Sequence, residues 1–122
     1  MKLHPAHFSH QYIFTGYGNE YVEINQIRYE KNLIVLPSQL IENWPVISIS
    51  ELEIQHFENL LPHTPEIVIL GTGISHQFPH YSLLSQMAKM GIGIEIMDTK
   101  ACCRTYNILV EEGRRVAAAL LI

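Results

Sequence analysis

The sequence predicts an α/β fold on the evidence of three features of its 122 residues. From Ile47 onward, short apolar segments typical of strands alternate with segments of helical spacing. Such alternation is typical of crossover units on a largely parallel sheet. The first 40 residues instead carry short apolar or alternating runs separated by turn residues, which predicts antiparallel strands. No repeat, low-complexity stretch or linker interrupts the chain, so we predict a single α/β domain over 1–122.

The strands predicted in the N-terminal part are short and end at recognisable turn residues. Gly and Asn residues at 16–19, Asn25 and Lys31-Asn32 separate the apolar runs. Pro37 closes this region, and a further apolar run follows Pro45. We therefore expect strands over residues 12–14, 21–24, 26–29, 33–36 and 46–49.

The first predicted helix, over 51–61, has clear local signals. Ser50 and Glu53 have the spacing of a capping box, in which each side chain bonds to the backbone N–H of the other residue. Apolar residues then recur at helical spacing as far as Leu61, and Pro62 ends the helix.

The C-terminal half continues the alternation of strands and helices. The run at 66–70 is almost entirely apolar, as in a strand that is buried on both faces of a parallel sheet. After a glycine turn, a helix begins with Pro79 in its first turn and ends at Gly91. The elements that follow are a strand over 91–97, a helix over about 100–112 that Asp98 or Thr99 caps, and a strand over 115–122.

The composition argues against two classes of protein, nucleic-acid-binding proteins and proteins inserted in a membrane. Eight Lys and Arg residues against twelve Asp and Glu residues give a net charge of −4, which argues against nucleic-acid binding because phosphates need a basic excess. No apolar run reaches the ~18–20 residues of a membrane helix, so no membrane insertion is expected. The charged fraction of 16% is low, which favours more apolar surface than a solitary monomer needs.

The two cysteines indicate a reducing compartment. Cys102 and Cys103 are adjacent, and neighbours in a helix cannot form a disulfide without breaking it. The first residues, from Met1 to Pro5, lack the apolar core of a secretory signal. We therefore predict reduced thiols and a cytoplasmic location.

Several strings in the C-terminal half are distinctive in their order. They lie at residues 69–73, 77–79, 91–99, 103–109 and 112–120. With them, the chain resembles a family of small, largely uncharacterised α/β domains whose eukaryotic relatives include a mitochondrial assembly factor for respiratory complex I. The resemblance implies a three-layer fold with a central mixed sheet and no known reaction. Combined with the elements above, it leads us to expect a mostly parallel sheet, three helices and N-terminal antiparallel strands. Since the sequence shows no organelle-targeting segment, we expect a bacterial member.

The turn Gly71-Thr72-Gly73 follows a buried strand, at the position where open α/β sheets bind ligands. A dinucleotide fingerprint would need a further glycine where His76 stands, and no phosphate-binding Gly-Lys-Ser/Thr string follows. Two interpretations remain. Either the turn needs glycine for a positive φ angle, or its amides form an anion-binding nest.

A second candidate site lies on the last predicted helix. Arg104 and Asn107 share a helix face with Lys100 and Glu111 and could hold a carboxylate or a phosphate. Tyr106 could add its hydroxyl group. The alternative is a solvated helix face with a local ion pair. Together with the glycine turn, these residues form the candidate ligand-binding site.

No metal site, and no cofactor, is predicted from the histidines, although there are seven of them. Structural zinc sites combine Cys and His residues at fixed spacings, which are absent here. The histidines that recur at short intervals are His4, His7, His10, His76 and His80.

No catalytic residue is predicted. Neither Cys102 nor Cys103 has a base that the sequence places beside it, so neither is expected to be a nucleophile. Glu95 is expected to lie inside a buried strand, where its charge would need a partner. Arg114 or Arg115, at the start of the last strand, is the predicted partner.

The leading hypothesis is a noncatalytic interaction or assembly module with an unidentified protein partner, and a homo-oligomer remains open. An apolar or aromatic patch would bind the partner. The candidate anchors are Tyr12, Tyr17, Tyr21, Tyr29 and Trp44. The alternative hypothesis is a small-molecule (anion) binding protein or enzyme with its site at the glycine turn and the Arg104 face, and enzymatic activity is left open.

Overall fold

The computed structural model describes residues 11–122 and contains two β-sheets. The smaller one, here called the N-terminal sheet, is antiparallel in the order β1-β2-β3. Its strands are β1 (Phe14–Gly18), β2 (Tyr21–Ile24) and β3 (Ile27–Tyr29). This sheet confirms antiparallel strands at the N-terminal end of the chain.

The larger sheet, here called the central sheet, has five strands in the order β5-β4-β8-β6-β7. They are β4 (Leu33–Leu36), β5 (Gln39–Ile41), β6 (Ile67–Thr72), β7 (Gly93–Met97) and β8 (Val116–Leu121). β6 pairs in parallel with β7 and β8, whereas β4 pairs antiparallel with β5 and β8. The mixed sheet is confirmed, but a mostly parallel sheet is wrong, because the β4–β5 hairpin supplies two antiparallel pairings.

Residues 11–122 contain two α-helices rather than the expected three. α2 (Tyr81–Lys89) begins after His80, whose ring nitrogen accepts a hydrogen bond from Ser82 N–H. α3 (Thr99–Glu111) begins after Asp98, whose carboxylate accepts from Ala101 N–H at 2.9 Å. The α3 cap therefore confirms Asp98 as one of the two predicted caps.

The predicted helix over 51–61 is replaced by three short 3-10 turns, η1 (Ile49–Glu51), η2 (Ile54–Phe57) and η3 (Leu61–His63). The carbonyl of His56 accepts the Trp44 indole N–H at 2.7 Å instead of bonding to the next helical turn. Leu60 N–H consequently donates to Phe57 O at 3.1 Å, which is the tighter 3-10 pattern. The Trp44 side chain thus takes the carbonyl that an α-helix would pair with Leu60 N–H.

The strand expected over 46–49 is also absent. The backbone N–H of Val46 donates to Trp44 O, and the carbonyl of Val46 accepts from the Asn32 side chain. Because both backbone groups of Val46 are bound in this way, the segment does not join a sheet.

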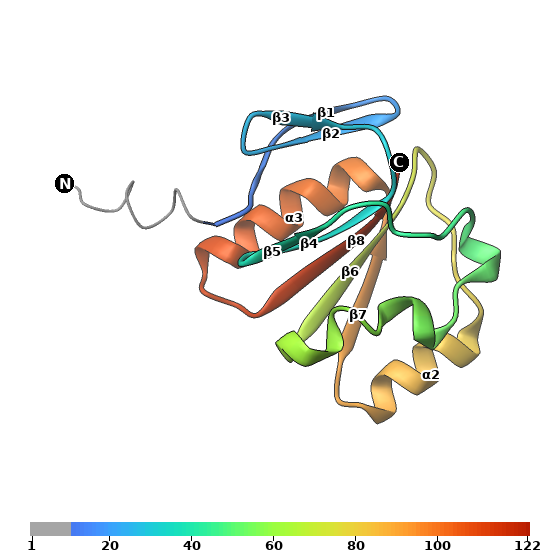
Figure 1. The fold of residues 1–122 in the computed structure, drawn as a ribbon. Coiled ribbons are helices and arrows are strands. Elements are labelled where there is room, and N and C mark those ends of the chain that lie inside the picture. The colour runs from blue at the N-terminus through green and yellow to red at the C-terminus, as the bar shows by residue number, and fades with distance from the viewer. Residues whose placement is uncertain (1–10) are drawn as a thin grey trace.

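Two apolar cores lie on the two faces of the central sheet (Figure 1). α2 and the 3-10 turns cover one face, and α3 covers the other. The N-terminal sheet packs on the outer side of α3, so α3 lies between two sheets (Figure 1). This outer sheet adds a layer to the three that we expected from the resemblance.

Candidate functional site

The predicted ligand-binding residues of α3 hold the N-terminal sheet in place. Asn107 Oδ1 accepts from Phe14 N–H at 2.9 Å, and Asn107 Nδ2 donates to Phe14 O at 2.7 Å. The hydroxyl of the fully buried Tyr106 donates to Tyr12 O at 2.9 Å, and its ring meets Phe14 edge-on at 5.2 Å. The polar atoms of Tyr106 and Asn107 are therefore bound to the backbone around β1.

Arg104 is exposed at the rim of the same contact. Its guanidinium donates to the Tyr17 hydroxyl at 3.1 Å and lies 6.0 Å from the centre of that ring. The hydrogen bond to Tyr17 is the main cause that raises the pKa of Arg104. The expected solvated helix face is thus partly covered, because Arg104 and Asn107 both contact the N-terminal sheet.

The glycine turn is tied to the start of α3. Gly73 has a φ of 90°, which confirms the positive φ predicted for this turn. Its N–H donates to Thr99 Oγ1 at 2.9 Å, and the Thr99 hydroxyl donates to Leu121 O at 2.7 Å. The buried Thr99 therefore links the turn to the end of β8 and occupies the Gly73 amide.

Gly71 and Thr72 also have structural partners. A Cβ atom at Gly71 would lie 2.9 Å from Leu120 Cδ2 and 3.1 Å from Thr99 Oγ1, so a larger residue there would have to displace these side chains. The hydroxyl of Thr72 donates to Ser75 O at 2.6 Å and stabilises the loop that follows.

A cavity of about 450 Å³ lies beside the turn, at the carboxyl ends of β6 and β8. Gly73 and Lys100 line it, together with residues 18–21 of the β1–β2 hairpin. Arg104, Tyr106 and Asn107 do not line it. The two halves of the predicted site therefore do not line this cavity together, and anion binding there stays a prediction.

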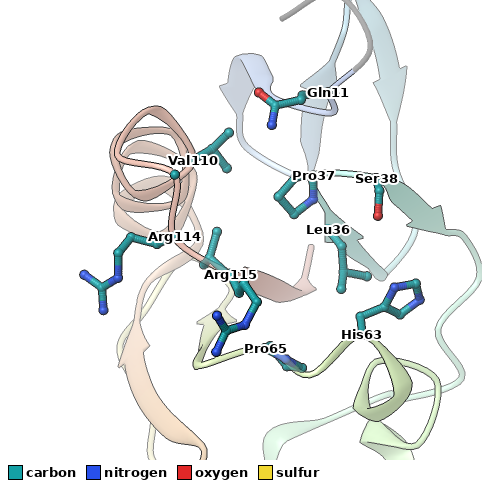
Figure 2. Close-up of a pocket in the computed structure, with 11 residues that line it drawn as sticks. Gln11, Leu36, Pro37, Ser38, His63, Pro65, Val110, Arg114 and Arg115 are labelled. Carbon is teal, nitrogen blue, oxygen red and sulfur yellow. The ribbon is translucent and has the colours of Figure 1, made fainter. Parts of the chain in front are cut away.

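A second cavity, of about 250 Å³, lies at the opposite end of the central sheet (Figure 2). Its lining includes His63, Val110 and Arg115. Arg115 Nε is bound to Thr64 O at 3.0 Å. The Arg114 side chain points away from this cavity in Figure 2.

The arginines at the start of β8 contact Glu66 rather than Glu95. Arg114 Nε donates to Glu66 Oε1 at 3.1 Å, and Arg115 N–H donates to the same oxygen at 3.1 Å. These two hydrogen bonds lower the pKa of Glu66, the backbone bond from Arg115 contributing most. The predicted buried pair of Glu95 is wrong, because β7 is an edge strand and Glu95 is exposed.

Both cysteines are buried and reduced. Burial raises the pKa of the Cys103 thiol to about 12 and raises the pKa of Cys102 well above its usual value. Cys102 Sγ lies 3.9 Å from Ile69 O, inside the core between α3 and the sheet. Such protonated, inaccessible thiols are poor nucleophiles.

We expect neither thiol to react with iodoacetamide in the native protein at pH 8, whereas both react after unfolding in urea. Because the Cys103 thiol ionises near its usual pKa of 9.0 in the unfolded chain and near 12 in the folded one, stability is unaffected below pH 9 and falls as the pH rises toward 12. Mass spectrometry of the alkylated chain checks the first expectation, and urea midpoints at pH 8 and pH 10.5 check the second. Rapid alkylation of the native protein would contradict the burial described here.

Within residues 11–122, no cluster of three metal-binding side chains is present. His76 Nε2 lies 3.2 Å from Ile96 O, and His80 serves as the α2 cap. The remaining predicted histidines, His4, His7 and His10, lie outside the described residues.

The large apolar side chains that are most exposed are not the predicted anchors. Trp44 is only 4% exposed and packs edge-on against Phe57 at 5.6 Å, so its prediction as an anchor is wrong. The four predicted tyrosines, at 12, 17, 21 and 29, are half-buried.

Three exposed apolar side chains instead lie close together in the sequence, between the end of β6 and the start of α2. Ile74 is 84% exposed, Phe78 69% and Tyr81 76%. We call these three residues the loop patch. The loop patch was not predicted from the sequence, although a signal was present: its apolar residues lie between a glycine turn and a helix start and follow neither helical nor strand periodicity.

A family model described as "Protein of unknown function (DUF498/DUF598)" matches residues 14–121. The chain belongs to the DUF498/DUF598 family. This assignment confirms the resemblance given above. A solved structure of a Bordetella pertussis protein, described as a Mth938-like domain, shares 32% sequence identity and superposes with a TM-score of 0.79. The match covers 99% of this chain and 92% of that one, so the fold is Mth938-like.

Two relatives of this DUF498/DUF598 chain have contrasting names. NADH dehydrogenase (ubiquinone) 1 alpha subcomplex assembly factor 3 of Rattus norvegicus is 32% identical over 123 residues, which cover 99% of this chain and 66% of that protein. The "13 kDa major membrane protein" of Francisella tularensis subsp. holarctica (strain LVS) is 32% identical over 107 residues, which cover 84% of this chain and 87% of that protein. In the part of this chain that the structure describes, no helix has the length and apolar content needed to cross a bilayer.

Proposed function

We propose that this chain is a noncatalytic interaction module that binds a partner protein through the loop patch and assists the assembly of a protein complex. The observation that carries the proposal is the exposure of Ile74 and Phe78 in the loop after β6 and of Tyr81 at the start of α2. Exposed apolar clusters of this kind are typical of interaction sites. The name of the rat relative supports an assembly role, and respiratory NADH dehydrogenase is the first complex to test.

The loop that carries the patch is held in a defined conformation. Gln77 N–H donates to Thr72 Oγ1 at 3.3 Å, and His76 is bound to Ile96 O. Pro79, near the end of the loop, is buried. A preorganised loop loses little conformational entropy on binding, so more of the energy of burying an aromatic ring, about 1.5–3 kcal/mol, contributes to affinity.

The proposal places the chain in the bacterial cytoplasm. Two reduced, buried thiols support a reducing compartment. The name of the Francisella relative supports a search for the partner among membrane-associated proteins.

Capture of partners from cells of the source organism tests the proposal. We expect the tagged double variant Phe78→Ser/Tyr81→Ser to recover about tenfold less of the proteins that co-purify with the wild type, because aromatic anchors dominate binding energy. Ile27→Ser/Ile108→Ser is a matched control, since these side chains are exposed apolar residues (57% each) elsewhere on the surface. Quantitative mass spectrometry measures the recovery.

Both double variants alter exposed side chains, so their thermal midpoints should stay within about 2 °C of the wild type. Equal recovery by the loop-patch variant and the wild type would refute the proposed function. Loss of the same partners in the control variant would also contradict it, because binding would then not depend on the loop patch.

A further inference from the structure

The sheets of this chain have four edges, and three of them are short or covered. β5 and β3 have three residues each. At the outer edge of β1, Asn107 binds both backbone groups of Phe14, and an irregularity between Phe14 and Gly16 interrupts the strand. Such devices protect edges from pairing with other chains. On β7, which has five residues, the described residues place one side-chain contact, from His76 to Ile96 O at 3.2 Å.

The backbone of β7 has a free hydrogen-bonding side. Gly93 N–H donates to Glu66 O at 3.2 Å, and backbone groups along a strand point alternately to its two sides. The backbone N–H and C=O groups of Gly93, Glu95 and Met97 therefore point toward β6. Those of Ile94 and Ile96 point outward, away from the sheet. Among the described residues, the one group that contacts this outer side is His76, which lies 3.2 Å from Ile96 O.

His76 also connects the edge to the loop patch. The His76 ring meets the Phe78 ring at 4.6 Å between centroids. The open backbone of β7 and the exposed ring of Phe78 are thus parts of one continuous surface. An added strand would gain main-chain hydrogen bonds from the edge and side-chain contacts from the patch, the two components of binding by β-strand addition.

Charge decides between a second copy and a different partner. In an antiparallel pair of two β7 strands at full overlap, Glu95 would lie directly opposite Glu95 of the other copy. Like charges directly opposite destabilise a sheet. Glu95 is exposed, and the chain carries a net charge of −4, so a basic residue opposite Glu95 is the complementary choice.

We propose that an extended segment of a partner protein, with a basic residue between two apolar residues, adds to the outer edge of β7 as an extra strand. The basic residue pairs with Glu95, and the apolar residues lie beside Ile94 and Ile96. This inference rests on the proposed function, and it specifies the form of the partner segment.

Titration of the ¹⁵N-labelled chain with the peptide acetyl-Ser-Thr-Val-Lys-Val-Thr-Ser-amide tests the inference by NMR. We expect the amide signals of Ile94 and Ile96 to shift and their hydrogen exchange to slow about tenfold at saturation, because both groups become bonded. A peptide with Glu in place of Lys should bind on the order of two- to fivefold more weakly. Glu95→Lys should reverse this preference, whereas Glu111→Lys, a change at an exposed glutamate of α3, should not.

Absence of shifts at Ile94 and Ile96 at millimolar peptide would overturn the inference, as would binding whose charge preference Glu95→Lys leaves unchanged. Dimerisation of the free chain with protection of the same two amides would show a second copy on this edge and would also overturn it. If partner capture depends on the loop patch while the peptide fails, the proposed function stands and the strand addition does not. If neither binds, both fail.

Discussion

Phe57→Ala should lower the free energy of unfolding by about 3–5 kcal/mol, the usual cost of deleting a large ring from a packed core. Phe57 lies in η2, is 0% exposed, and packs edge-on against Trp44 at 5.6 Å. It belongs to the core between the 3-10 turns and one face of the central sheet. The backbone hydrogen bonds of these turns run within the segment 48–64, so we expect this buried ring to be a main attachment of the turns to the core.

Urea unfolding followed by circular dichroism measures the change. Glu58→Ala is the matched control, since Glu58 is the exposed neighbour of Phe57 and should change stability by less than about 0.5 kcal/mol. A loss of under about 1 kcal/mol for Phe57→Ala would mean that segment 49–63 does not close this core.

The elements that the sequence predicts well are those whose local and tertiary preferences agree. β6, α2, β7, α3 and β8 all lie where apolar periodicity and turn residues place them, with small shifts at their ends. The segment over 51–61 has helical spacing too, but the same spacing also lets its apolar residues face the core from 3-10 turns. The indole of Trp44 binds the carbonyl of His56, and local periodicity does not reveal a tertiary contact of this kind.

Strand order was equally hidden in the sequence. The run Gly93–Met97 is as apolar as a central strand except for Glu95, so it predicts a buried position. In the fold this strand lies at the edge of the central sheet. Glu95 is therefore exposed, and its charge needs no buried partner. A single polar residue in an apolar strand was the available signal for an edge.

The candidate site shows a different limit. A guanidinium, a phenol and an amide close together on one helix suggest a ligand, and the chemistry of that prediction is sound. In this fold the Asn107 amide binds backbone that lies 93 residues earlier in the chain. Polar groups that hold a distant segment of the same chain have the same spacing as groups that hold a ligand, so only the structure separates the two cases.

Tyr106→Ala should also cost about 3–5 kcal/mol, because the Tyr106 ring is fully buried between α3 and the N-terminal sheet. Its loss removes the edge-on contact with Phe14 at 5.2 Å and the hydrogen bond to Tyr12 O. Since β1 is attached to α3 partly through these contacts, hydrogen exchange of the β1 and β2 amides should accelerate more than that of β6 and β8.

Tyr106→Phe separates the ring from its hydroxyl. This variant keeps the packing but leaves Tyr12 O without its donor, so we expect a smaller loss of about 1–3 kcal/mol. Urea midpoints of the two variants give the comparison. If Tyr106→Ala were no more destabilising than Tyr106→Phe, the ring would contribute nothing to holding the N-terminal sheet. The hydroxyl bond to Tyr12 O would then be the important contact.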